Sequence, residues 1–472
     1  MRKLLLFTFF ILAFATCAFA DEIEDLKKQM QAMQEQFQGQ LNEIQKQHNE
    51  TVSNLQTRIE QLESQRERQQ VQLGSKEELK KEIISDLKSQ TPATSQQPLF
   101  SQAVGSSQVK LMDISFDSLF AAGGSTASET EIDKLQAGAH DPKKRGFTTQ
   151  NLEFSMLGAV DPYFNAESHL IFQVDKDGES KIEVEEASLT TQSLPYGLQV
   201  KAGHFFTEFG RLNASHPHTW DFVDQPVINS RMFGGDGLRS PGARLSWLTP
   251  LPWYSEVLLG AENANGETAI SFLNKAGEDF SGYTELSREV HKMSDLLYLT
   301  RWLNSFNLND ETTLNLGASA LFGPNATGVD NRTNIYGTDI YLKWKPRIND
   351  HGFPFVASQT ELMKRKFEAG ETKDNLNDYG LYTQLLYGFK RNWVAGLRYD
   401  FADGNGLSTD SLRDRRYRVS PNLTWYPTEF SKIRLQYNYD KAQHISDDGR
   451  GDEHSIWIQY EFMLGAHPKH KF

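Results

Sequence analysis

From residue 109 onward, apolar and polar side chains alternate along the chain with a period of two. Residues 432–440 read Lys-Ile-Arg-Leu-Gln-Tyr-Asn-Tyr-Asp, and residues 454–462 repeat the arrangement. About 16 such segments follow one another, each about ten residues long, which is the length that a tilted strand needs to cross the hydrocarbon of a bilayer. They begin near residues 109, 147, 163, 181, 198, 242, 255, 296, 312, 334, 355, 379, 393, 416, 432 and 454.

The connections between these segments alternate in length. Tight connections at 161–162, 193–197, 249–254, 390–392 and 426–431 alternate with longer polar ones at 121–146, 207–240, 261–294, 323–333, 368–378, 402–414 and 441–452. Two connections depart from the rule, 175–180 and 345–354. Short turns on one rim and long loops on the other are typical of outer-membrane barrels. We therefore predict an all-β fold, a transmembrane antiparallel up-and-down barrel of about 16 strands.

The first hundred residues follow a different pattern. Residues 1–20 resemble a secretory signal peptide, with two basic residues, an apolar run and a small-residue cleavage site. Apolar residues then step by three and four, which predicts a periplasmic α-helical coiled coil over 21–90; a single amphipathic helix on another surface is the alternative. Residues 91–108, rich in Ser, Gln and Pro, are predicted to be a flexible linker, and 109–472 the barrel.

Composition narrows the function. The formal net charge of -13 argues against a nucleic-acid partner, which requires a basic surface. After the signal no run of 18 apolar residues remains, so membrane-spanning helices are excluded, whereas strands that meet lipid with every second residue are not. The chain has no nucleophile elbow, P-loop, dinucleotide fingerprint or His-Glu-x-x-His sequence. We expect neither an enzyme nor a cofactor.

The longest connection without strand alternation, 207–241, is the candidate constriction of a pore. Loops of this length in a compact domain are usually functional. Folded into the lumen, it would place both signs of charge in the channel; a mobile extracellular loop is the alternative. Its candidate residues are Glu208, Arg211, His216, His218, Asp221, Asp224, Arg231, Asp236 and Arg239.

The strand period also predicts which side chains face the lumen. If the apolar residues of 416–425 face lipid, then Arg416 and Arg418 face inward. The same phase turns Arg398, Lys432 and Arg434 inward, which gives a basic wall, and turns Glu167 and His169 inward on the third strand. Opposed charges across a water-filled pore would select small polar or charged solutes. Salt bridges without selectivity are the alternative.

A metal site is a further candidate in the same loop. His216 and His218, separated by Pro217, lie close in sequence to Asp221 and Asp224. Imidazole and carboxylate groups are ligands that suit zinc. We therefore keep His216, His218 and Asp221 as candidate metal ligands.

The order of coiled coil, linker and barrel resembles the DcaP-type and phosphate-selective O/P-type porins. The stretches NLEFSMLGAVDPYFNAESHLIFQVD and EEASLTTQSLPYGLQVKAGHFFTEFGRLN are similar to strands 2–5 of the O/P group in order and spacing. The resemblance implies a homotrimer of 16-stranded barrels that carry small, often anionic solutes. The block HPHTWDFVDQPVINSRMFGGDGLRSPGARLSW is similar to a group labelled zinc-regulated outer-membrane receptors. Energised receptors have a plug and 22 strands, so metal-linked uptake alone is retained from that group.

We expect an outer-membrane porin for diffusion of small polar or charged solutes, with the coiled coil in the periplasm. The alternatives are an uptake protein for zinc or a metallophore, and a structural tether between the membrane and the cell wall. The expected partners are outer-membrane lipid, further copies of the chain in a homotrimer, and the barrel-assembly machinery. The last strand ends at Phe462 and resembles the aromatic-terminated signal that this machinery reads.

Overall fold

The computed structural model describes residues 101–104, 107–110, 112–174, 178–274, 279–406, 410–442 and 451–465. The predicted signal peptide and coiled coil lie outside the described residues, as does most of the predicted linker. Within the linker, Ser101–Val104 (β1) pairs antiparallel with Ser107–Lys110 (β2), so its end is a short hairpin where the sequence predicted flexible chain. Backbone hydrogen bonds are enough to hold such a pair, so its sequence need not alternate between apolar and polar residues.

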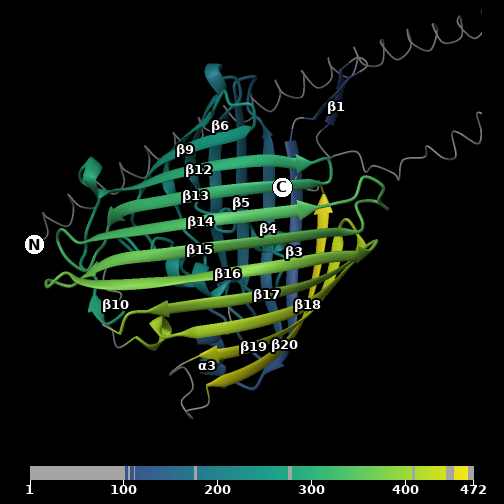
Figure 1. Ribbon diagram of the computed structural model, residues 1–472. Helices are drawn as coiled ribbons and strands as arrows, with labels where there is room; N and C mark the ends of the chain where they lie inside the picture. The colour runs from purple at the N-terminus through teal and green to yellow at the C-terminus, as the bar shows by residue number, and fades with distance from the viewer. Residues whose placement is uncertain are drawn as a thin grey trace, which may run out of the picture. The chain divides into compact units, whose positions relative to one another are not determined.

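Sixteen antiparallel strands close into a barrel (Figure 1), which confirms the predicted strand number. The last strand closes the ring by pairing with the first, from Ser455 opposite Ser125 to Gly465 opposite Ser115. The strands are β3 (Met112–Ser125), β4 (Gly146–Ala159), β5 (Phe164–Val174), β6 (Ser180–Thr191), β7 (Leu198–Phe206), β8 (Arg239–Leu248), β9 (Tyr254–Asn263), β12 (Leu296–Asn309), β13 (Thr312–Pro324), β14 (Arg332–Trp344), β15 (Phe355–Ala369), β16 (Asp374–Lys390), β17 (Trp393–Gly404), β18 (Arg416–Thr428), β19 (Ser431–Ala442) and β20 (Asp452–Gly465).

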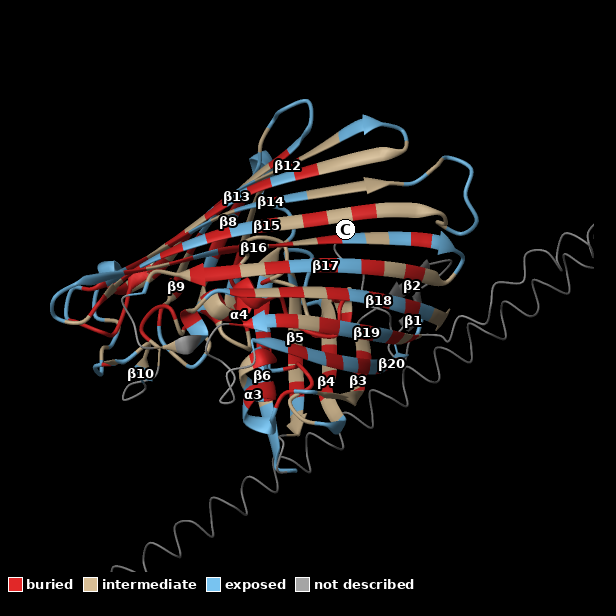
Figure 2. Cartoon of the chain, turned by 60° about the horizontal axis from the view of Figure 1, so that its bottom comes forward, coloured by how far each residue is buried: buried red, intermediate tan, exposed pale blue. Residues whose placement is uncertain are grey.

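Along most of the strands, alternate residues face opposite environments (Figure 2). On β18, Arg418 is 1% exposed, whereas Leu423 is 40% exposed on the outer surface. Leu435 on β19 and Ile458 on β20 are about half exposed, and the residues on either side of each are buried. An apolar outer surface around a polar interior is the arrangement of a barrel that lies in lipid. The chain is therefore an outer-membrane β-barrel.

The connections follow the predicted alternation. Turns of two to six residues join β4 to β5, β6 to β7, β8 to β9, β12 to β13, β16 to β17 and β18 to β19, and most connections at the other rim are longer. The two exceptions in the sequence, β5 to β6 and β14 to β15, are also exceptions here. A third connection differs from the prediction: the loop expected over 368–378 contains only residues 370–373, because β15 runs to Ala369 and β16 starts at Asp374. Among the residues that the structure describes, no helix is long and apolar enough to cross a membrane.

The long loops contain their own short elements. Glu129–Leu135 (α3) starts at Ser128, whose side chain accepts a hydrogen bond from the backbone of Glu131 in a capping box. Val227–Phe233 (α4) ends at Gly234, which has φ of 84°. The third long loop holds Asp279–Phe280 (β10), paired with Tyr283–Thr284 (β11). Three short 3-10 turns lie in the connections of this end, η2 (Pro217–Thr219), η3 (Met293–Asp295) and η4 (Ser411–Arg413), and η1 (Pro195–Gly197) lies in a short turn.

A hydrophobic core lies inside the barrel rather than between layers. Apolar side chains from residues 207–238 and 264–273 pack against inward residues of β12 to β17. Phe209, Ile228, Met232 and Phe272 are each at most 1% exposed. The loops at one end of the barrel therefore fill part of its interior.

Candidate functional site

The connection between β7 and β8, residues 207–238, lies in the barrel interior; we call it the lumen loop. Its backbone amides donate to inward side chains of strands in separate sectors of the ring: Gly210 to Ser319 Oγ of β13 (3.2 Å), Leu212 to Glu361 Oε1 of β15 (3.0 Å) and Val223 to Gln436 Oε1 of β19 (2.8 Å). A loop outside the barrel cannot reach these partners. It crosses the lumen.

Asp224 attaches the lumen loop to three consecutive strands. Its fully buried carboxylate accepts from Arg398 Nη2 (2.6 Å) on β17 and from Arg418 Nη1 (2.9 Å) on β18. Gln436 and Asn438 on β19 add two more hydrogen bonds, of 3.0 and 2.7 Å. Burial by itself raises the pKa of Asp224, but the guanidinium groups of Arg418 and Arg398 outweigh it and lower the pKa to about 2. The loop is held by an ionised carboxylate.

The cations of the predicted basic wall face inward, and four of the five are paired with carboxylates. Arg398 pairs with Asp400 (2.7 Å), and both Arg416 (2.7 Å) and Arg418 (2.9 Å) pair with Asp440. Lys432 pairs with Glu461, and Arg434 donates to Thr424 Oγ1 and Gln459 Oε1. The carbonyl of Leu135, in the loop between β3 and β4, also accepts from Arg416 and Arg418. All five cations are at most 5% exposed, so this wall is covered rather than open to water.

The other predicted residues of the lumen loop bind separate parts of the wall. Arg211 stacks on the ring of Tyr341, 4.1 Å from its centroid, and Asp221 accepts from Gln384 Nε2 (2.8 Å). Arg231 donates to two main-chain carbonyls of the β17–β18 loop. Glu208 pairs with Arg244 (3.0 Å). The main-chain carbonyl of Asp236 accepts from Arg239. The strand β8 starts three residues earlier than predicted, so Arg239 is its first residue and not part of the loop. Arg239 pairs with Glu183.

Histidines of the lumen loop meet acidic residues of β4 and β6. His216 lies 2.8 Å from Glu185 and 3.0 Å from Glu186, and His218 Nδ1 lies 3.1 Å from Glu153 Oε2. Burial lowers the pKa of His216, but Glu153 and Glu185 raise it well above its ordinary value; Glu153 likewise raises the pKa of His218. Both side chains therefore favour the protonated form.

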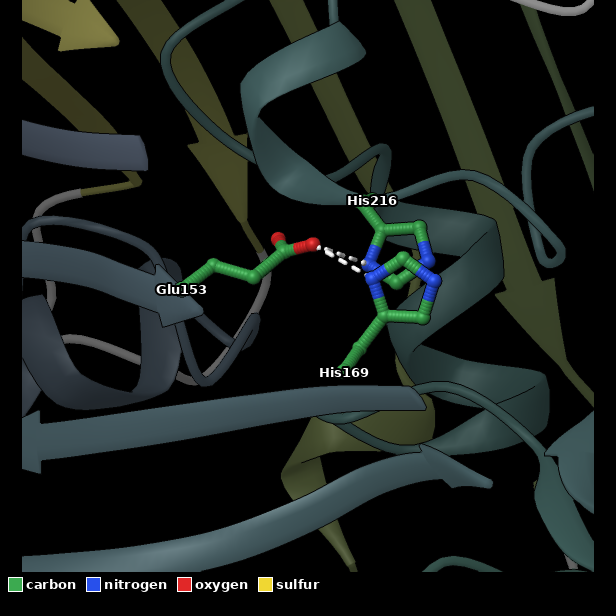
Figure 3. A group of neighbouring side chains, drawn as sticks. All are labelled: Glu153, His169 and His216. Atoms are coloured by element: carbon green, nitrogen blue, oxygen red, sulfur yellow. Dashed lines mark hydrogen bonds and ion pairs between the residues drawn. The ribbon is translucent and has the colours of Figure 1, made fainter. Parts of the chain in front are cut away.

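Glu153, His169 and His216 converge most closely (Figure 3). One ligand atom from each lies within 4.8 Å of the other two. Asp221, a metal candidate from the sequence, lies instead against Gln384. Glu153 is not among the site residues predicted from the sequence, although an acidic residue on the inward phase of an apolar strand was the available signal.

Glu185 and Glu186 were missed for a different reason. A bulge between β5 and β6, where His169 faces Glu186 and Leu170 faces Val184, leaves Glu185 unpaired. As a result both glutamates are buried, at 1% and 7% exposed, although adjacent strand residues normally face opposite sides. The alternation alone does not reveal this.

A cavity of about 440 Å³ opens near the rim with the short turns. Its lining comes from β3 to β8 and includes Asp113, Glu167, Lys201 and Arg244. Lys201 lies 2.5 Å from Glu167, the sequence candidate on this face. The cavity therefore presents both signs of charge to whatever enters it.

The chain is 32% identical over 395 residues to an uncharacterized protein of Aquifex aeolicus (strain VF5), a match that covers 77% of this chain and 80% of that protein. No protein-family model matches. Solved structures with a similar fold include the outer membrane channel DcaP of Acinetobacter baumannii (10% identity, TM-score 0.49, covering 75% of this chain and 97% of that chain). They also include an anion-selective porin from Comamonas acidovorans (9%, 0.45, 75% and 98%) and OprB of Pseudomonas putida (12%, 0.46, 75% and 94%).

Proposed function

We propose that this chain is a narrowed channel for small polar or charged solutes. The chain belongs to the same family as the Aquifex aeolicus protein and is a porin-like outer-membrane barrel of sixteen strands. The observation that carries the proposal is the lumen loop, whose amides bind β13, β15 and β19 from inside. A barrel of this size without such a loop encloses a wide aqueous channel. The loop reduces that width to a selective passage.

The cavity near the short-turn rim supports the solute class. Its polar and charged lining, with Glu167, Lys201 and Arg244, favours solutes that form hydrogen bonds and carry charge of either sign. The arginines Arg398, Arg416 and Arg418 are paired with carboxylates, so we do not expect the channel to select strongly for anions. The passage instead sorts solutes mainly by size.

We infer a homotrimer, with residues 21–90 as a periplasmic coiled coil that helps to join the chains. β20, which closes the ring against β3, is the strand that the barrel-assembly machinery would recognise through Phe462. Crosslinking of the purified chain in mild detergent tests the trimer, and a monomeric species alone would contradict it.

Ionic current through the purified, folded protein in a planar lipid bilayer tests the channel. We expect discrete current steps in potassium chloride, because a water-filled passage conducts small ions. The tether function predicts a closed barrel together with peptidoglycan binding by residues 21–90. Absence of current in every salt would remove the channel proposal and favour the tether.

A further inference from the structure

We propose that Glu153, His169 and His216 bind one divalent transition-metal ion of the zinc class, which fastens the lumen loop to the barrel wall. His216 belongs to the loop, whereas Glu153 and His169 belong to the neighbouring strands β4 and β5. A metal ion here would therefore join the loop to the wall at a second place, separate from Asp224. The proposal concerns binding and does not depend on whether the channel conducts.

The distances between the three side chains suit a tetrahedral ion. Glu153 Oε1 lies 2.9 Å from His169 Nδ1 and 3.4 Å from His216 Nδ1. Zinc bonds of about 2.0–2.2 Å in a tetrahedron separate neighbouring ligand atoms by about 3.3–3.6 Å. Side-chain movements of a few tenths of an ångström would open the group to that spacing. Figure 3 shows both imidazole rings directed at the same carboxylate oxygen.

Glu185 is placed to be the fourth ligand. Its Oε2 lies 2.8 Å from His216 Nδ1, and its side chain is 1% exposed. A proton on His216 Nδ1 joins these two buried atoms as an ion pair. A metal ion would replace that proton and bind both atoms.

The surroundings of His216 also fit a ligand that is held in a fixed orientation. Its second nitrogen, Nε2, lies 3.0 Å from Glu186 Oε2. Glu186 in turn accepts from the backbone amide of Phe206 (3.0 Å) and lies 3.5 Å from Lys201 Nζ. A carboxylate that accepts from the far nitrogen of a metal-bound histidine is the usual support of a zinc ligand.

The donor atoms set the class of ion. Two imidazole nitrogens with carboxylate oxygens suit zinc and its neighbours in the first transition series, whereas magnesium and calcium prefer oxygen ligands alone. Glu153, Glu185 and Glu186 bring three carboxylates together, and a divalent cation would neutralise two of those charges. Zinc is therefore the probe of choice, and cobalt serves as its visible substitute.

The test is titration of the folded full-length protein with zinc by calorimetry, and with cobalt by visible absorption. We expect one ion per chain at micromolar zinc and the intense absorption of tetrahedral cobalt. His169→Ala and His216→Ala should abolish both signals, and Glu186→Gln should weaken binding by about 10- to 100-fold. Glu153→Gln, which keeps the side-chain shape, covers the case in which an alanine variant fails to fold.

Two controls assign the site. His351→Ala removes an exposed histidine of the β14–β15 turn and should bind as the unaltered protein does. Asp221→Ala removes the carboxylate of the rival ligand set and should also leave binding unchanged. The proposal is overturned if micromolar zinc does not bind, if folded His169→Ala and His216→Ala variants bind it unchanged, or if Asp221→Ala abolishes binding.

Discussion

Replacement of Asp224 by alanine should release the lumen loop from the wall. The carboxylate is fully buried and holds four hydrogen bonds to three consecutive strands, two of them from arginines. Removing one partner of a buried ion pair costs about 3–5 kcal/mol. Arg398 keeps Asp400 and Arg418 keeps Asp440, so we expect the lower end of that range. A loss of about 3 kcal/mol changes the ratio of attached to released loop about a hundredfold.

Single-channel recording in planar bilayers measures this change. Asp224→Ala should show larger current steps and more frequent transitions between current levels than the unaltered protein, because the loop no longer narrows the passage continuously. Asp236→Ala is the matched control: it removes a carboxylate of the same loop whose Oδ1 has no hydrogen-bond partner among the described residues. Equal conductance and equal noise in Asp224→Ala and Asp236→Ala would refute the anchoring role of Asp224.

The pKa of Asp224 is about 2 in the fold and 3.8 ordinarily, so its ionised form stabilises the fold by about 2 kcal/mol above pH 4. This stabilisation is lost as the pH falls from 4 towards 2. Current noise should therefore rise between pH 4 and pH 2 and stay constant from pH 5 to 7. Leu435→Arg places a charge on the outer surface and should lower the free energy of unfolding in lipid by about 2–4 kcal/mol, as measured by urea titration, whereas Leu435→Phe should change it little. Phe272→Ala empties part of the core inside the barrel and should destabilise the packed loops by about 3–5 kcal/mol. This loss should appear as faster amide hydrogen exchange in residues 207–238. Exchange at the rate of the unaltered protein would contradict this packing.

Much of the barrel could be predicted because strand alternation is a local property. The period of two depends only on which face each residue meets, so residues 432–440 and 454–462 predicted β19 and β20 without knowledge of their partners. The short and long connections then gave the antiparallel order. For the same reason, the inward phase of Arg416 and Arg418 was legible in the sequence.

The pairing of those side chains could not be predicted, because it depends on distant segments. Asp224 meets Arg398 and Arg418 only after the lumen loop has folded back across the ring, and Leu135 reaches the same arginines from another loop. The sequence therefore showed the cations and left open whether salt bridges pair them, whereas the folded chain pairs four of the five with carboxylates. The bulge that turns Glu185 and Glu186 inward together is also invisible to a strict alternation.

The swelling of liposomes that contain the purified protein tests whether the lumen loop narrows the barrel. Uncharged solutes of increasing size are added outside, and the initial swelling rate is measured for each. We predict rapid entry of the smallest solutes and a steep fall in rate as size increases. Equal rates for all sizes would show a wide open barrel, and no entry even of the smallest solute would show a closed one. Either result would overturn the proposed narrowing.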